Sequence, residues 1–158
     1  MILRVMIVED EDMIRNGLVK TLPWADMGCT VIGSAGDGKS GLEQIVERRP
    51  DVVITDIRMP EMDGFEMLER ALAVYRFHII IFTSYAEFDY AQKAISIHAY
   101  DYLLKPLDEK RLAELLARIR ETEEPQEQLE TPGSFSAEEL LKRLAYTDEY
   151  VETALRRI

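Results

Sequence analysis

Hydrophobic positions along the first 120 residues follow two alternating patterns. Short runs of apolar, often β-branched residues are separated by longer segments in which apolar residues recur every three or four positions. The short runs are typical of strands that are covered on both faces, and the longer segments are typical of amphipathic helices. The five short runs are Leu3–Val8, Thr30–Ser34, Asp51–Thr55, His78–Phe82 and Tyr100–Leu104.

One strand is followed by one helix, five times over. This order predicts an α/β fold in which a five-stranded parallel sheet lies between layers of helices, with right-handed crossover connections. Asp37 and Gly38 mark a turn before the second helix. Ser84 and Glu87 fit a capping box that would open the fourth helix. The clearest helical stripe is formed by Leu112, Leu115, Leu116 and Ile119.

The character of the chain changes after residue 122. Residues 123–135 are rich in Glu, Gln, Thr and Pro, so we interpret them as a linker between a domain of residues 1–122 and a last helix of residues 136–158. Apolar residues recur every seven positions in that helix, which is a weak coiled-coil pattern. We expect the helix either to pack on its own domain or to begin a truncated output or dimerisation region. The repeating positions are Ala137, Leu144, Val151 and Ile158.

Composition narrows the classes of function. Of 158 residues 47% are hydrophobic, which is enough for a sizeable core, and the formal net charge of −11 disfavours nucleic-acid binding by this chain. Cys29 is the single cysteine, so we expect neither a disulfide nor a thiolate metal site, and we interpret it as a small buried hydrophobe. Because long apolar segments and a secretory signal pattern are missing, we expect a cytoplasmic protein with no membrane partner.

Candidate chemistry gathers where the predicted strands end. Ligands of open parallel sheets bind beyond the carboxyl ends of the strands. Three carboxylates held close there repel one another, and a hard cation such as Mg²⁺ relieves that repulsion through oxygen ligands. A carboxylate beside such a metal can attack a phosphoryl group, and a lysine and a hydroxyl can bind the product. The side chains at the strand ends are those of Glu9, Asp10, Asp56, Thr83 and Lys105.

Four segments of the chain resemble the receiver domain of bacterial two-component response regulators, and the resemblance covers about residues 1–122. It implies a flavodoxin-like (βα)5 three-layer sandwich with strand order 2-1-3-4-5. It also implies a signalling regulator that a sensor histidine kinase phosphorylates, and whose own catalysis is limited to phosphoryl transfer and dephosphorylation. Homodimerisation on phosphorylation and control of transcription through an output region are further expectations. The segments are Met6–Glu11, Ile54–Gly64, Phe82–Tyr85 and Tyr102–Pro106.

The resemblance gives each site residue a role. Asp56 would be the phosphoacceptor, and Lys105 would bind the phosphoryl group. Mg²⁺ would be held directly by Asp10 and Asp56, and through a water molecule by Glu9. The backbone carbonyl of Arg58 would be a further metal ligand. Glu9 departs mildly from the family pattern, in which Asp is frequent, so the metal-bound water is expected to shift.

Switching and phosphoryl lifetime involve a second set of residues. The resemblance makes Thr83 and Tyr102 the switch pair: the hydroxyl moves to the phosphoryl group and the ring rotates inward. It also places Pro106 in a cis peptide. The large side chains of Arg58 and Tyr85 should flank the approach of water to the phosphorus, so we expect the phosphoryl group to be lost slowly.

Three other function classes are less consistent with the sequence. A phosphatase with an aspartate nucleophile has a second acid two residues after it, where this chain has Arg58, which cannot be a general acid. A flavin or nucleotide binder would find its phosphates repelled by residues 9–12. A pseudo-receiver that only mediates protein contacts would not need the complete set of carboxylates, hydroxyl and lysine. His78 and His98 lack ligand partners at metal spacing, so we interpret them as structural.

Overall fold

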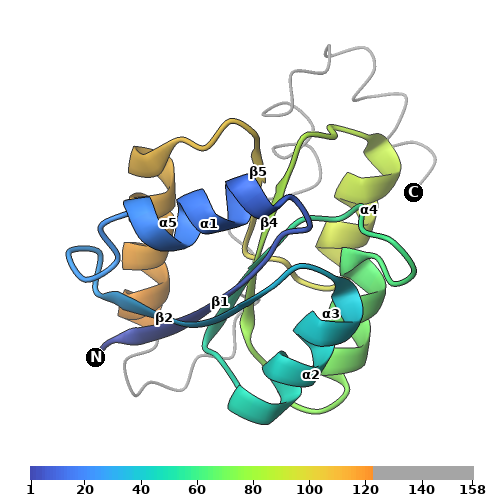
Figure 1. Ribbon diagram of the computed structural model, residues 1–158, viewed down its shortest axis with the longest axis horizontal. Helices are drawn as coiled ribbons and strands as arrows, with labels where there is room; N and C mark the ends of the chain where they lie inside the picture. The colour runs from blue at the N-terminus through green and yellow to red at the C-terminus, as the bar shows by residue number, and fades with distance from the viewer. Residues whose placement is uncertain (123–158) are drawn as a thin grey trace.

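The computed structural model describes residues 1–122, and within them five strands alternate with five helices (Figure 1). The strands form one parallel sheet in the order β2-β1-β3-β4-β5. The α/β class, the five parallel strands and the 2-1-3-4-5 order expected from the sequence are therefore confirmed. The elements are β1 (Leu3–Val8), α1 (Asp12–Thr21), β2 (Cys29–Ala35), α2 (Gly38–Arg48), β3 (Val52–Thr55), α3 (Gly64–Leu72), β4 (His78–Thr83), α4 (Phe88–Ser96), β5 (Asp101–Leu104) and α5 (Glu109–Thr122).

The central strands are apolar on both faces because helices cover the sheet on both sides. Successive residues of β1 alternate between the two cores: Met6 and Val8 lie in one, whereas Val5 and Ile7 lie in the other. Helices α2, α3 and α4 cover the first core, and α1 and α5 cover the second (Figure 1). Leu112 and the other three residues of the predicted stripe are all buried in that second core.

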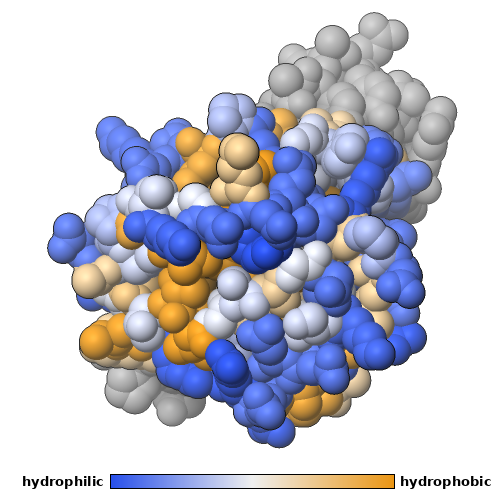
Figure 2. All heavy atoms as spheres, viewed as in Figure 1, coloured by the Kyte–Doolittle hydropathy of each residue, from blue (hydrophilic) through white to orange (hydrophobic). Residues whose placement is uncertain are grey.

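The polar sides of the helices face outward. Figure 2 shows hydrophilic side chains over most of the visible face of the described residues, with hydrophobic residues grouped in smaller areas. Cys29 is buried, as expected, and burial raises the pKa of its thiol to about 11. None of the helices within residues 1–122 is long and apolar enough to cross a membrane.

Helix starts test the local predictions. The side chain of Asp37 accepts a hydrogen bond from the backbone amide of Ser40 and caps α2, in agreement with the predicted turn. The capping box predicted from Ser84 and Glu87 is wrong. Helix α4 begins at Phe88, and Glu87 makes no capping bond because its carboxylate pairs with the Arg58 side chain instead.

Two further expectations concern the chain after β5. The Lys105–Pro106 peptide is cis, as expected. The predicted linker of residues 123–135 and the predicted helix of residues 136–158 lie outside the described residues.

Candidate functional site

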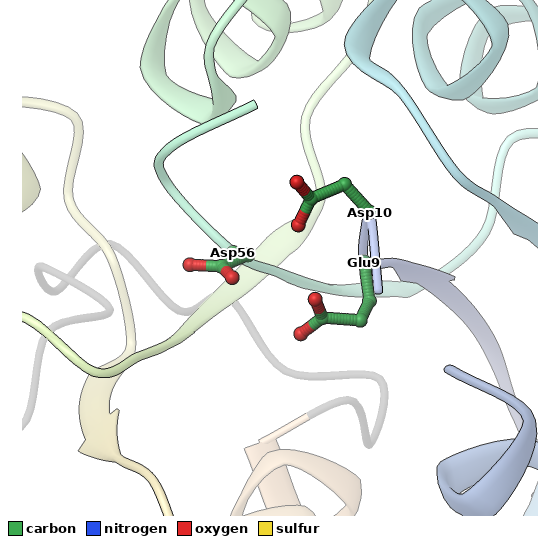
Figure 3. Close-up of side chains that lie close together, drawn as sticks. All are labelled: Glu9, Asp10 and Asp56. Carbon is green, nitrogen blue, oxygen red and sulfur yellow. The ribbon is translucent and has the colours of Figure 1, made fainter. Parts of the chain in front are cut away.

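Strands β1 and β3 are neighbours in the parallel sheet, so their carboxyl ends meet at one edge. Val8 is paired with Thr55, and the backbone amide of Asp56 donates to the carbonyl of Val8 at 3.0 Å. This pairing brings together Glu9 and Asp10 after β1 and Asp56 after β3 (Figure 3). One carboxylate oxygen from each residue lies within 4.8 Å of the other two, and this is the acidic cluster expected from the sequence.

Lys105 joins this cluster from the end of β5. Its Nζ donates to Oδ2 of Asp56 at 2.9 Å and lies 2.7 Å from Oε1 of Glu9. The Lys105 side chain is only 11% exposed, and those of Glu9 and Asp56 are 1% and 8% exposed. One ammonium group is therefore shared between two carboxylates with little access to water.

Burial and the shared ammonium act in opposite directions on the pKa values. Burial raises the pKa of Glu9 above its ordinary value and the charge of Asp56 adds to the rise, although Lys105 and the Glu11 amide oppose it. Burial alone would lower the pKa of Lys105, but its interactions with Glu9 and Asp56 prevail and raise it. Lys105 therefore keeps its charge, whereas Glu9 holds a proton more readily than an exposed glutamate does.

The oxygen-rich chemistry of this cluster fits a hard divalent cation. Oε1 of Glu9 is buried and lies 2.7 Å from the Lys105 ammonium, but it completes no hydrogen bond with the described residues. That oxygen can accept from a metal-bound water. Asp10 is half-buried beside it and is free of the Lys105 contact. Mg²⁺ requires this kind of site, with one or two carboxylates and several waters.

Backbone contacts fix the direction of Asp56. Its Oδ1 accepts from the amide of Ile57 at 2.7 Å, and the carbonyl of Ile57 accepts from the amide of Gly64 at 2.7 Å. A Cβ atom at position 64 would lie 2.2 Å from the carbonyl oxygen of Asp56, so only glycine allows this close approach. The side chain of Asp63 caps α3, and the support that Gly64 gives to Asp56 was not predicted from the sequence.

Thr83 and Tyr102 lie on the neighbouring strands β4 and β5. Thr83 is the last residue of β4 and is completely buried. The Tyr102 ring is also buried, and its hydroxyl donates to the backbone carbonyl of Tyr85 at 2.6 Å. The amide of Tyr85 makes a long contact of 3.4 Å with Oγ1 of Thr83. The segment that follows Thr83 is thus tied to both residues, with the tyrosine ring turned inward.

Arg58 reaches across to α4. Its guanidinium lies 3.7 Å from the centre of the Tyr85 ring, its Nε donates to the Tyr90 hydroxyl at 2.7 Å, and it forms a salt bridge with Glu87. The two large side chains expected to flank the phosphorus therefore stack on each other. The partners Glu87 and Tyr90 were missed because they lie about thirty residues from Arg58 along the sequence.

The comparisons with known proteins identify the family. A family model described as the response regulator receiver domain matches residues 5–117. The chain belongs to this family. A receiver domain of residues 1–122 was expected from the sequence, and the alternatives of a phosphatase and a nucleotide binder are not supported.

Relatives and solved structures agree with this assignment. The chain is 35% identical over 158 residues to the transcriptional regulatory protein HptR of Staphylococcus aureus, and the match covers 98% of the chain but 62% of that protein. The chain thus spans less than two thirds of the length of this relative. The receiver domain of AraT from Geobacillus stearothermophilus superposes with a TM-score of 0.70 at 39% identity, covering 77% of the chain and 95% of that domain. The response regulator domain of CheB from Thermotoga maritima gives 0.62 at 29% identity, covering 77% and 96%.

Proposed function

We propose that this receiver domain accepts a phosphoryl group on Asp56 from a sensor histidine kinase. The observation that carries the proposal is the contact of Lys105 with both Asp56 and Glu9, next to the half-buried carboxylate of Asp10. A pseudo-receiver would not need an ammonium and three carboxylates gathered at the end of the sheet. This combination is suited to binding a phosphoryl group and the cation that accompanies it.

Asp10 and Asp56 would hold Mg²⁺ directly, the backbone carbonyl of Arg58 would be a third ligand, and Glu9 would hold a metal-bound water. When bound, Mg²⁺ supplies positive charge against the phosphoryl oxygens and the crowded carboxylates. The buried Oε1 of Glu9, which accepts no hydrogen bond from the described residues, supports the water-mediated role. Glu9 is one methylene longer than aspartate, so we expect the metal-bound water that it holds to be shifted.

Phosphoryl transfer begins when one carboxylate oxygen of Asp56 attacks the phosphorus of a phosphohistidine or of acetyl phosphate. The new bond joins that oxygen to phosphorus, and the bond from phosphorus to the donor breaks with its electron pair on the donor. The Ile57 amide donates a hydrogen bond to Oδ1 of Asp56 and so limits the rotation of the carboxylate. The Lys105 ammonium lies 2.9 Å from Asp56 before transfer. After transfer it would form an ion pair with a phosphoryl oxygen, which then carries the negative charge. Hydrolysis of the same bond by water ends the signal.

The expected output is a change in the surface formed by α4, β5 and α5. The Thr83 hydroxyl would turn to the phosphoryl group and leave its long contact with the Tyr85 amide. The bond from Tyr102 to the Tyr85 carbonyl would then carry that shift into the segment before α4. We propose that the altered surface forms a homodimer. Sedimentation with and without beryllofluoride, a phosphoryl mimic, tests this step, and an unchanged mass would reject it.

Transcription is the proposed final output. The support is the similarity to HptR, which is described as a transcriptional regulatory protein and of which this chain spans 62%. DNA binding would belong to an output region and not to residues 1–122. We further propose that the protein works in the cytoplasm, where small phosphoryl donors such as acetyl phosphate are made.

Intact-mass measurement tests the phosphoacceptor. Wild-type protein with acetyl phosphate and Mg²⁺ should gain the mass of one phosphoryl group, and EDTA should prevent the gain. Asp56→Asn should remain unmodified, whereas the matched control Asp51→Asn, one residue before β3, should be modified as wild type is. Modification of Asp56→Asn to the same extent, or labelling that ignores EDTA, would contradict the assignment.

A further inference from the structure

Arg15 forms hydrogen bonds with two residues of the acidic segment that follows β1, Glu9 and Asp12. It lies on the first turns of α1, and its Nη1 donates to the backbone carbonyl of Glu9 at 2.7 Å. Its Nη2 donates to Oδ1 of Asp12 at 2.7 Å. The Arg15 side chain is 19% exposed, whereas Asp12 is 81% exposed. The bond to the Glu9 carbonyl is therefore the sheltered one, and the exposed ion pair with Asp12 contributes little.

The other side of the Glu9 backbone is also held. The Glu9 amide donates to the carbonyl of Ala35 at 3.0 Å, which extends the pairing of β1 with β2 by one residue. Both backbone groups of Glu9 are thus bound, the amide by the sheet and the carbonyl by Arg15. Since the same peptide unit leads to Asp10, its orientation determines where the Asp10 side chain starts.

Gly36 leaves the space that Arg15 occupies. A Cβ atom at position 36 would lie 2.8 Å from Nη1 of Arg15, which is closer than real contacts allow. The backbone there does not itself require glycine, because Gly28 is the one glycine with a positive φ among residues 1–122. Gly36 therefore lies directly after β2 as a small residue against which the Arg15 guanidinium packs.

We propose that Arg15, seated against Gly36, is a positioning residue that orients Glu9 and Asp10 for Mg²⁺. The inference rests on the proposed metal site and adds to it a residue that never touches the metal. Residues that hold metal ligands in place typically change metal affinity by about 10- to 100-fold when they are removed. Arg15 acts on the backbone of one ligand and on the first residue of the helix that follows.

The direction in which removal of Arg15 changes the Mg²⁺ affinity shows whether Arg15 acts by positioning the ligands or by its charge. Arg15 carries a positive charge close to a cation site, so its removal would tighten Mg²⁺ binding if charge were its only influence. If Arg15 positions the ligands, Arg15→Gln weakens Mg²⁺ binding roughly tenfold despite the lost repulsion. Calorimetric titration of MgCl₂ into the metal-free protein measures the dissociation constant directly. Phosphorylation by acetyl phosphate should need more Mg²⁺ but reach the wild-type rate at saturation.

Gly36→Ala perturbs the same contact without removing any charge. The added methyl group meets the flexible end of the Arg15 side chain, so the guanidinium moves and the backbone stays in place. Gly36→Ala should therefore weaken Mg²⁺ binding about as much as Arg15→Gln does. In the Arg15→Ala background the methyl group occupies vacated space, so adding Gly36→Ala should change affinity less than twofold. Additive losses would show that Gly36 does not act through Arg15 and would overturn the proposal.

Arg48→Ala is the matched control. Arg48 also donates from Nη1 to a backbone carbonyl, that of Ile32, at 2.6 Å, but this contact lies along β2 away from the acidic cluster. The Arg48→Ala variant should bind Mg²⁺ with the same affinity as the wild type. If Arg15→Gln binds Mg²⁺ as tightly as the wild type or more tightly, Arg15 is not a positioning residue. If the wild type itself fails to bind Mg²⁺, the proposed metal site fails, which is a separate result.

Discussion

Replacing Lys105 with methionine removes the ammonium and keeps a side chain of similar length. The wild-type Nζ lies 2.7 Å from Glu9 and 2.9 Å from Asp56, so the change leaves two buried carboxylates without their common partner. Breaking a fully buried ion pair on one side costs about 3–5 kcal/mol. Lys105 is 11% exposed and water relieves part of this cost, so we expect the metal-free protein to lose about 2–3 kcal/mol of unfolding free energy near neutral pH.

The loss should depend on pH in a defined direction. The pKa of Glu9 is already raised above its ordinary value of 4.5 in the folded protein, so the folded state binds this proton more tightly than the unfolded state does. A raised carboxyl pKa contributes stability below the ordinary value, and that contribution is lost as the pH rises through the folded value. Without Lys105 the pKa rises further. The deficit of Lys105→Met should therefore grow as the pH rises above the ordinary carboxyl pKa.

Urea unfolding of the metal-free protein at several pH values, in chelator, measures the deficit. Lys20→Met is the matched control, since Lys20 is exposed on α1, and it should shift the unfolding free energy by less than about 0.5 kcal/mol. Excess Mg²⁺ should stabilise Lys105→Met more than the wild type, because it neutralises the same two carboxylates. A deficit that does not change with pH or with Mg²⁺ would refute the shared-ammonium reasoning.

Three more changes test other parts of the site. The double variant Arg58→Asn, Tyr85→Glu should lose its phosphoryl group several-fold faster than the wild type in a radiolabel or mass assay, because it removes the stacked pair that is expected to shield the phosphorus from water. An unchanged or slower rate would reject shielding. Asp10→Ala should weaken Mg²⁺ binding more than Glu9→Ala does in calorimetry, because a direct ligand contributes more than a water-mediated one. Gly64→Ala should lower the unfolding free energy in urea by about 2–3 kcal/mol, because its Cβ would meet the Asp56 carbonyl at 2.2 Å, and near-wild-type stability would show that the loop adapts.

The sheet and the acidic cluster could be predicted because their signals are local and additive. Each buried strand shows its own apolar run, and a parallel sheet places every carboxyl end at the same edge. The predicted strand ends agree with the observed ones to within one residue: Val8, Thr55 and Leu104 are correct, whereas Thr83 was expected after β4 and is its last residue. The strand order came from the family resemblance, since hydrophobic patterns do not specify which strands are neighbours.

The capping box at Ser84 and Glu87 shows where local reasoning fails. Its sequence spacing was correct, but a capping bond must compete with any stronger partner that the fold brings near. Arg58 offers Glu87 a charged guanidinium, and the carboxylate pairs with it instead of with its own backbone. The contact between Arg15 and Gly36 likewise could not be predicted from the sequence, because it depends on the end of β2 lying beside the first turns of α1.

The Arg58 contacts also connect the proposed metal site with the segment before α4, two regions for which the sequence shows no link. The loop after β3 carries the backbone carbonyl proposed to bind Mg²⁺, and the same residue extends its side chain to Glu87 and Tyr90 at the start of α4. Movement of this loop toward a bound metal would pull on the first turn of α4. The Tyr102 hydroxyl holds the other end of that segment through the Tyr85 carbonyl. The segment between β4 and α4 is therefore held both from the loop after β3 and from β5, so the proposed metal binding and phosphorylation would act on the same short stretch of chain.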